Sequence, residues 1–405
     1  MITQSKSLGL WTIGLVSLFS FGLAGCGGSA PKGRASTAKM DTPKYHNETG
    51  EYKLAQGDFD DAKRSFQKAL ELEPNSSFAK SGLAVSKAHQ TNAPHVSDAT
   101  KKQVLKQGEQ WLKEAEKGAK TDQDKARAHR YGLRFYVVLG QPSNWYDKAK
   151  DHYEDAASLE PNEAANHFYM ASGHALTGNY DDAKSLYNKV LKINGAFADE
   201  ADIELERIHK IERALPSSRF GKDIANVDKI TRADTAALLL AELRLDKLFA
   251  SQQRDYSASF APPETMRAFK RSPAQNMPEA TDLRGNKLSD SIELVLALGL
   301  KGLEADASHK FYPSDTLTRG EFALILQSIL AKALGDEAMA TQYVGQSSPY
   351  PDVKAEHWSY NAIRVNVQRG LMKVKDIRSS NFEPMGDVSG ADALLAISKL
   401  KRIIR

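Results

Sequence analysis

The sequence predicts an all-α protein built from two consecutive helical regions with short loops between their helices. Three similar segments between Gly57 and Ala196 carry alanine and aromatic residues at helical spacing, which indicates repeated helical hairpins. Further along, Thr318-Arg-Gly-Glu321 has the pattern of a capping box, and apolar residues follow it on one helical face. Phe382 lies 71 residues after Phe311 in a matching segment, so this second helical unit is also repeated.

The chain begins with the features of a signal peptide over residues 1–25. Lys6 precedes a mostly apolar run from Leu8 to Leu23, and small residues then lead to Cys26, the single cysteine of the chain. A transmembrane helix is the alternative, but the run is short and rich in Gly and Ser. One cysteine also excludes an intramolecular disulfide framework.

The Leu-Ala-Gly-Cys26 ending resembles a bacterial lipobox. This resemblance implies that Cys26 becomes the lipidated first residue of the mature protein, held in a membrane by its acyl chains. Gly27, rather than Asp, follows the cysteine, and by analogy with lipoproteins of diderm bacteria we expect the periplasmic side of the outer membrane. In a monoderm, the site would be the outer leaflet of the plasma membrane. Residues 26–44 have little to bury and are predicted to be a flexible tether.

The segments beginning at Gly57, Asn144 and Gly178 resemble the tetratricopeptide (TPR) family, and we assign residues 45–199 to a TPR-like array. In such repeats, small residues let paired helices approach closely, a role expected here for Ala62, Ala149 and Ala183. The spacing is irregular between the first two segments, so we expect long helices over about 76–90 and 96–117. Counting these, the array has about four hairpins, followed by a bridging helix over about 200–214.

TPR arrays bind protein partners on a concave face made by the first helix of each hairpin. The resemblance places Tyr131, Arg134 and Phe168 on that face as candidate protein-binding residues. The alternative is that Tyr131 and Phe168 pack between helices, which is the commoner fate of aromatic residues at helical spacing. The Lys/Asn set that some TPR proteins use to hold a C-terminal carboxylate is not evident, so the protein partner is unidentified.

Residues 200–405 contain three degenerate copies of the second unit, over about 200–250, 280–334 and 349–405. The clearest motifs are two helix starts at Thr231-Arg232 and Thr318-Arg319 and, in the third copy, Asp352 and His357-Trp358. These residues resemble the S-layer homology (SLH) family, whose modules hold proteins to the bacterial cell wall. The resemblance implies a helical SLH triplet at the C-terminal end.

Two arginines in these helix starts are the candidate ligand-binding residues. Capping accounts for Thr318 and Glu321, whereas arginine is unfavourable beside the positive end of a helix unless an anion docks there. In the SLH family this arginine is associated with acidic wall glycan, so we predict that Arg232 and Arg319 bind glycan. The resemblance adds Asp352 and Trp358, and Trp358 either stacks on a sugar or lies in the module core. The third copy, at Ser389-Gly390, lacks the arginine.

No catalytic motif is found, and we expect neither an enzyme nor a cofactor. The net charge of +4 is spread along the chain without a basic, aromatic-rich run, which excludes a nucleic-acid partner. His152, His167 and His174 lack a carboxylate that would complete a metal site, so we expect no metal ion. The proline-containing stretch 251–281 reads as a mobile insertion or a functional flap.

We therefore predict a non-enzymatic envelope lipoprotein that links a membrane to the cell wall. Its SLH modules would bind acidic wall glycan or peptidoglycan, and its TPR repeats would bind a protein partner. The alternative is an outer-membrane assembly or secretion accessory factor, in which the TPR array does the work and the SLH region is a spacer. A glycan-processing enzyme is a third hypothesis. Arginines exposed in a shared groove would favour the first function, and arginines with internal partners the second.

Overall fold

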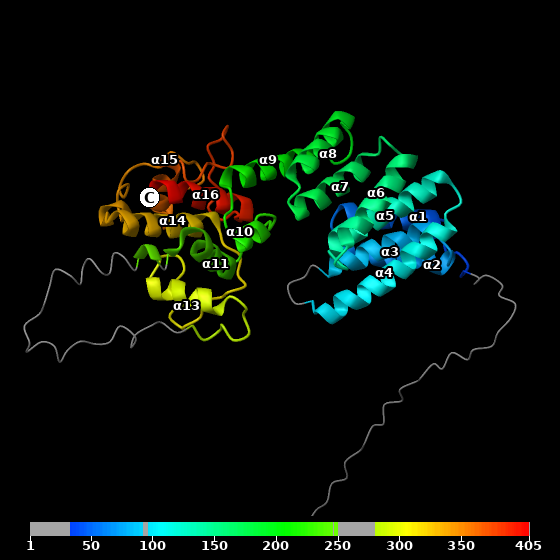
Figure 1. Ribbon diagram of the computed structural model, residues 1–405, viewed down its shortest axis with the longest axis horizontal. Coiled ribbons are helices and arrows are strands. Elements are labelled where there is room, and N and C mark those ends of the chain that lie inside the picture. The colour runs from blue at the N-terminus through cyan, green and yellow to red at the C-terminus, as the bar shows by residue number, and fades with distance from the viewer. Residues whose placement is uncertain (1–32, 92–95, 246, 250–279, 405) are drawn as a thin grey trace, which may run out of the picture.

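The computed structural model describes residues 33–91, 96–245, 247–249 and 280–404 as two helical lobes joined by one helix (Figure 1). Within these residues, β-structure is limited to three isolated bridges. No helix of the described part is both long and apolar enough to cross a membrane. The predicted signal peptide, Cys26 and nearly all of the predicted insertion lie outside the described residues.

The first lobe consists of four antiparallel helical hairpins. Their helices are α1 (Pro43–Ala55), α2 (Phe59–Leu72), α3 (Ser77–Gln90), α4 (Asp98–Gly118), α5 (Asp122–Leu139), α6 (Trp145–Leu159), α7 (Ala164–Thr177) and α8 (Tyr180–Ile193). Helices α3 and α4 agree with their predicted ranges to within two residues at each end. The irregular repeat spacing arises partly from α4, which has 21 residues where α2 and α3 have 14 each.

Small residues hold the helices of this lobe close together. The three alanines predicted at helix contacts, Ala62, Ala149 and Ala183, are all 0% exposed. Gly82 also lies against an aromatic ring, because a Cβ placed there would overlap Phe66. At each of these positions, a neighbouring helix or ring fills the space that a larger side chain would need.

The residues before α1 differ from the predicted tether. The Arg34 amide donates to the carbonyl of Glu71 at 2.6 Å, and the Arg34 guanidinium pairs with both Asp41 and Glu71. Thr42 then caps α1, so the helix includes the last two residues of the predicted tether. The final part of the predicted tether, from residue 33, is therefore attached to the end of α2.

Helix α9 (Ala198–Ala214) joins the lobes and matches the bridging helix predicted at 200–214. It packs against α8 on one side and against the last helix, α16 (Gly390–Ile403), on the other (Figure 1). Ion pairs fasten both contacts, Lys184 Nζ to Glu212 Oε1 at 2.6 Å and Lys210 Nζ to Asp392 Oδ1 at 2.9 Å. A single helix is thus packed into both lobes.

The second lobe is built on three helices that begin with matching caps. Its helices are α10 (Arg219–Ile224), α11 (Arg232–Leu243), α13 (Ser289–Leu298), α14 (Arg319–Leu334), the 3-10 helix η3 (Glu337–Ala340), α15 (Tyr360–Gln368) and α16. Thr231 and Thr318 form complete capping boxes with Asp234 and Glu321, as predicted. Ser389 likewise caps α16 through the amide of Asp392.

Backbone hydrogen bonds join the three helix starts to one another. The Leu317 amide donates to the carbonyl of Ile230, and the Ile230 amide donates to the carbonyl of Val388, both at 3.0 Å. The Gly390 amide donates to the carbonyl of Val227 at 2.8 Å. A Cβ at Gly390 would overlap the carbonyl of Ile224, which explains why the third copy has glycine where the other two have arginine.

Candidate functional site

Arg319 and Arg232 occupy equivalent places in the second lobe, and each binds backbone carbonyls. Arg319 Nε donates to the carbonyl of Phe382 at 2.9 Å and Nη2 to that of Lys373 at 2.7 Å. Arg232 Nε donates to the carbonyl of Phe311 at 2.8 Å and Nη1 to that of Gly302 at 3.0 Å. Each guanidinium also lies over the phenylalanine ring, within 4.8 Å of its centroid. Each arginine therefore attaches the start of its helix to a later segment of the chain.

Asp352 holds the same segment as Arg319. Its two carboxylate oxygens accept hydrogen bonds from the amides of Phe382 and Glu383 at 2.9 and 2.6 Å. Asp282 does the same for the amides of Phe311 and Tyr312 in the preceding repeat. The residue after each phenylalanine has a positive φ, 58° at Glu383 and 57° at Tyr312, so the carboxylate stabilises an unusual turn.

We expected arginine to be unfavourable at these helix starts unless an anion binds there. This expectation was wrong, because carbonyl groups of the chain bind both guanidinium groups. Arg319 is only 8% exposed, and burial lowers its pKa, although a guanidinium remains charged. Buried cations need compensating hydrogen bonds, and the carbonyls provide them. The internal contacts of Arg232, Arg319 and Asp352 therefore explain why these residues are present without a ligand.

Trp358 lies apart from these internal contacts. Its side chain is 55% exposed, so the alternative that it fills the module core is wrong. The ring approaches the start of α14 near Gly320, where a Cβ would lie 3.3 Å from the Trp358 ring. The exposed ring is therefore open to stacking by a ligand. It does not line the pocket beside Arg319 that is described next.

A pocket of about 250 Å³ lies between α9, α16 and the segment 371–377, with Arg319 in its wall. Two carboxylates line the pocket, those of Glu206 and Asp392. Six basic side chains also line it: Lys210, Arg213, Arg319, Lys373, Lys375 and Lys399. Burial lowers the pKa of Lys399, and the nearby positive charges of Lys373 and Arg213 lower it further. Within the described residues, Lys373 and Lys375 have no carboxylate within ion-pair distance. We call this cavity the basic pocket.

The corresponding hollow beside Arg232 has the opposite character. Its two basic side chains are Arg232 and Lys310. Four carboxylates line it: Glu304, Asp306, Asp315 and Glu321. An acidic ligand would be repelled there and attracted to the basic pocket. The two arginines predicted as equivalent ligand sites thus lie in electrostatically different surroundings.

In the first lobe, the predicted partner-binding residues mostly contact other helices. Tyr131 is 6% exposed, and its hydroxyl donates to Glu51 at 3.2 Å. Phe168 is partly buried and stacks on Phe197 at a centroid distance of 4.8 Å. Arg134 Nε donates to His89 Nε2 at 3.2 Å. The alternative of interhelical packing therefore describes both aromatic residues.

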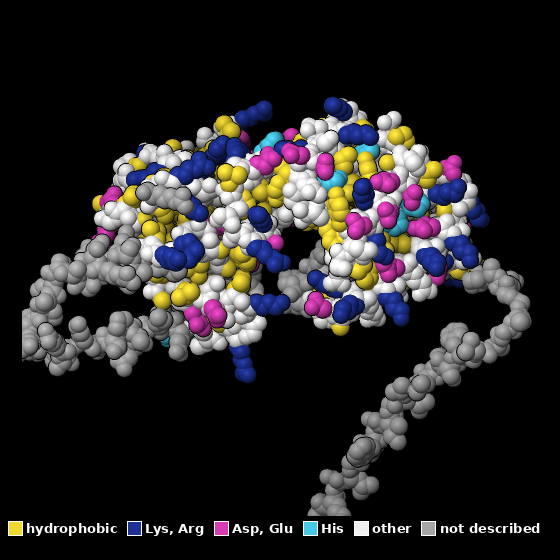
Figure 2. All heavy atoms as spheres, in the orientation of Figure 1, with side chains coloured by type: hydrophobic (Ala, Val, Ile, Leu, Met, Phe, Trp, Pro, Cys, Tyr) yellow, Lys and Arg dark blue, Asp and Glu magenta, His cyan; other side chains and the backbone are white. Residues whose placement is uncertain are grey.

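A larger groove in this lobe was not foreseen from the sequence. It runs between α1, α3 and the facing ends of α4 and α5, and its wall includes Phe78 and Arg127, whose guanidinium lies 4.2 Å from the ring centroid. Lysines and carboxylates both line it: Lys44, Glu48, Glu73, Lys80, Glu114, Lys117, Lys120 and Asp124. Over the face drawn in Figure 2, acidic and basic side chains are likewise interspersed. The groove is thus suited to a partner with both charges.

The histidines have two kinds of surroundings. His167 and His174 contact the hydroxyls of Tyr153 and Tyr146 at 3.1 and 2.9 Å, as expected for hydrogen-bonded histidines. His152 instead faces His129, and their Nδ1 atoms are 3.2 Å apart. The role of His129 was not predicted from the sequence, because 23 residues and the loop between α5 and α6 separate it from His152.

One comparison with known protein families gives a match. Residues 43–76, which form α1, α2 and the turn that leads to α3, match the tetratricopeptide repeat family model. No curated protein matches the chain. Stacked repeats of this kind create extended surfaces for binding other proteins. The first hairpin is therefore similar to a tetratricopeptide repeat, which indicates a role in protein–protein interaction.

Proposed function

We propose that this protein is a non-enzymatic envelope lipoprotein that binds a protein partner with its first lobe and an acidic wall polymer with its second. The basic pocket carries the wall-binding half of the proposal. Among the described residues, neither Lys373 nor Lys375 forms an ion pair, although the charge of Lys375 acts on Asp392, and Lys399 lies close enough to Lys373 and Arg213 for their charges to interact. A carboxylate-bearing glycan would supply the missing negative charge.

The exposed ring of Trp358 supports a sugar ligand on the same lobe. The aromatic face of Trp358 is a large apolar surface on which a sugar ring can stack. Because the ring lies outside the basic pocket, a long polymer would have to pass from one to the other. Arg319 would act chiefly by holding the segment that presents Lys373, through its hydrogen bond to that residue's carbonyl.

The partner-binding half rests on the four hairpins and the tetratricopeptide repeat match. We place the partner in the groove between α1, α3 and α5, because its wall offers an aromatic ring and both signs of charge. Cys26, as a lipidated residue, would hold the chain to the outer membrane or, in a monoderm, to the plasma membrane. The protein would then connect a membrane, a wall polymer and a protein partner.

The test is cosedimentation of the purified protein with isolated wall sacculi at low and moderate salt. We expect binding to intact sacculi that weakens as salt screens the lysines. Sacculi stripped of their attached acidic polymer should bind much less. Equal binding to stripped sacculi would move the ligand to peptidoglycan, and the absence of binding to either preparation would reject the wall-binding half.

One observation favours the alternative function, an outer-membrane assembly or secretion accessory factor. Arg232 and Arg319 use their guanidinium groups for internal carbonyls, as expected if the second lobe is a spacer. In that case the protein would bind its partner through the first lobe and ignore both sacculi preparations. The same sedimentation experiment therefore separates the two functions.

A further inference from the structure

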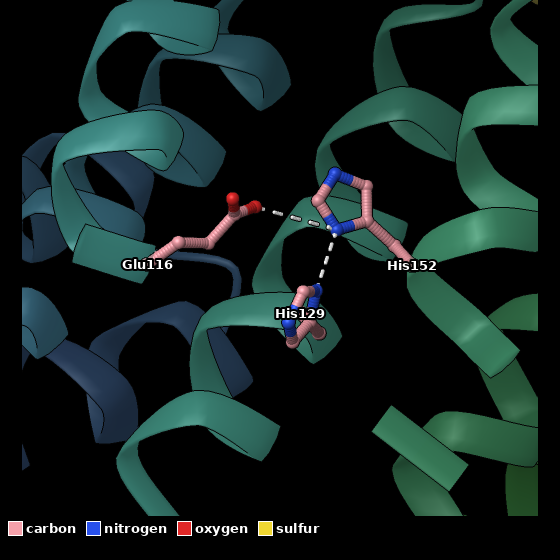
Figure 3. Close-up of side chains that lie close together, drawn as sticks. All are labelled: Glu116, His129 and His152. Atoms are coloured by element: carbon pink, nitrogen blue, oxygen red, sulfur yellow. Dashed lines mark hydrogen bonds and ion pairs between the residues drawn. The ribbon is translucent and has the colours of Figure 1, made fainter. Parts of the chain in front are cut away.

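Three side chains from three helices of the first lobe converge on one point (Figure 3). Glu116 comes from the end of α4, His129 from α5 and His152 from α6. The two Nδ1 atoms are 3.2 Å apart, and Glu116 Oε1 is 3.7 Å from His152 Nδ1. One potential ligand atom from each residue lies within 4.8 Å of the other two.

These separations are close to those around a tetrahedral metal ion. Zinc binds imidazole nitrogen at about 2.0–2.1 Å, so two such nitrogens are about 3.3 Å apart at tetrahedral angles. A small rotation of Glu116 would bring its oxygen to the same separation. Asp155, one turn beyond His152 on α6, has Oδ2 3.5 Å from His129 Nδ1, but it is not one of the three residues whose ligand atoms all lie within 4.8 Å of one another, so it would have to move to become a fourth ligand.

The position of His152 depends on a glycine that leaves room for it. A Cβ at Gly132 on α5 would lie 2.6 Å from Cε1 of the His152 ring. The ring of Tyr136, one turn beyond Gly132 on α5, stacks on the His152 ring, with centroids 5.6 Å apart and planes 27° apart. The histidine side chains are 20% and 15% exposed, so an ion can reach them from solvent while most of the site is shielded.

Other buried histidines of this lobe differ from this pair. His167 and His174 each have a tyrosine hydroxyl as partner. In the described part of the chain, the ring nitrogens of His129 and His152 hydrogen-bond only to each other. A pair of facing Nδ1 atoms can share one proton, or both can direct lone pairs at one cation.

We propose that Glu116, His129 and His152 bind one divalent transition-metal ion of the zinc type, with Asp155 or water as fourth ligand. Imidazole ligands favour such metals over Ca²⁺ or Mg²⁺, and the carboxylate offsets part of the metal's charge. The ion would join α4 to the α5–α6 hairpin. Since α4 is the long helix of the irregular hairpin, the metal would stabilise the least regular part of the array.

The experiment uses the full chain, treated with a chelator and then titrated with Zn²⁺ by calorimetry and with Co²⁺ by visible absorption. We expect one ion per chain and the absorption bands of tetrahedral Co²⁺. His129→Ala, His152→Ala and Glu116→Gln should each weaken binding about tenfold or more, since even outer contacts of metal sites contribute that much. The matched control is His174→Ala, which removes a partly buried histidine outside the cluster.

Stability gives a second measurement. An ion that binds only the native state raises the melting temperature, so at the same Zn²⁺ concentration the increase should be smaller for the cluster variants than for wild type and the control. Circular dichroism without metal would show that each variant is folded, and Glu116→Gln retains the shape of a side chain that is 37% exposed. The proposal is overturned if wild type binds no ion. It is also overturned if Glu116→Gln and a folded histidine variant bind as tightly as the control.

Discussion

At the scale of single residues, Arg319 and Arg232 are anchors for backbone segments that follow them in the chain. The carbonyls that they bind lie 71 residues apart in the two repeats, Phe311 with Phe382 and Gly302 with Lys373. Asp282 and Asp352, which are 70 residues apart, accept hydrogen bonds from the amides of the same two phenylalanines. The repeat is thus defined by polar side chains that hold its loops as well as by its apolar core.

Arg319→Ala should therefore destabilise the second lobe. The change removes two hydrogen bonds from a charged donor and leaves two inward-facing carbonyls without it, a loss of about 2–4 kcal/mol in the free energy of unfolding. Urea denaturation followed by circular dichroism measures this difference. Arg319→Lys is the control for charge. It should restore little of the lost stability, because an ammonium group cannot make the two separate hydrogen bonds that the planar guanidinium donates. An unchanged midpoint for Arg319→Ala would mean that the anchor contributes nothing.

His89 makes the first lobe sensitive to acid. Burial and the charge of Arg134 lower the pKa of His89 to about 3, so the folded state keeps this ring neutral below its usual titration range. The unfolded chain binds the proton first as pH falls below about 6.5, and the stabilisation is lost progressively from there toward pH 3. We expect the free energy of unfolding to fall by about 1–2 kcal/mol between pH 7 and pH 5 from this residue alone. Melting curves of His89→Gln should show a shallower dependence, and an identical pH slope would contradict the assignment.

Cys26 is the residue on which the proposed membrane attachment depends. Intact-mass measurement of the membrane-extracted protein should give a chain that starts at Cys26 and carries acyl groups. Cys26→Ser should remain unlipidated, because serine has no thiol to accept the lipid. An unmodified wild-type chain that starts at any other residue would reject the lipoprotein assignment.

At the scale of helices, small residues determine how closely the hairpins pack. Ala149 on α6 is fully buried, as are its counterparts on α2 and α8. Ala149→Leu should overpack this contact and lower the free energy of unfolding by about 1–3 kcal/mol. A thermal melt is the measurement, and Lys150→Leu on the same helix, where the side chain is 56% exposed, is the control. If both variants melt at the wild-type temperature, the small-residue register is wrong.

Local patterns in the sequence predicted the helices and their caps well. The capping boxes at Thr231 and Thr318 and the ends of α3, α4 and α9 depend on residues a few positions apart. The role of the arginines could not be predicted in this way, because their partners lie 54 to 79 residues further along the chain. The pairing of His152 with His129 could not be predicted for the same reason, because no local pattern shows that α5 and α6 place these two side chains together.

At the scale of the whole molecule, α9 connects the two lobes because its side chains are part of both hydrophobic cores. Buried Ile208 and Ile211 lie in the separate cores of the first and second lobes, respectively. Arg207 pairs with Asp228, and Lys210 pairs with Asp392 on α16, so polar contacts reinforce the apolar ones. Lys210 and Arg213 of this helix also line the basic pocket. A load on the pocket would therefore pass into the first lobe through one continuous helix.

The central claim, that the basic pocket binds an acidic wall polymer, is tested most directly by charge reversal. The variant Lys373→Glu/Lys375→Glu changes the rim of the pocket. Its control, Lys301→Glu/Lys310→Glu, makes the same change in net charge at exposed lysines outside the pocket. Both pairs should leave the fold intact, because surface substitutions away from packed contacts change stability little.

The measurement is quantitative cosedimentation of both variants and wild type with intact sacculi at low salt. We expect the pocket variant to bind about tenfold more weakly than wild type, equivalent to roughly 1.4 kcal/mol, while the control stays close to wild type. Equal loss in the two variants would mean that binding follows net charge and not the pocket. Undiminished binding by the pocket variant would contradict the central claim.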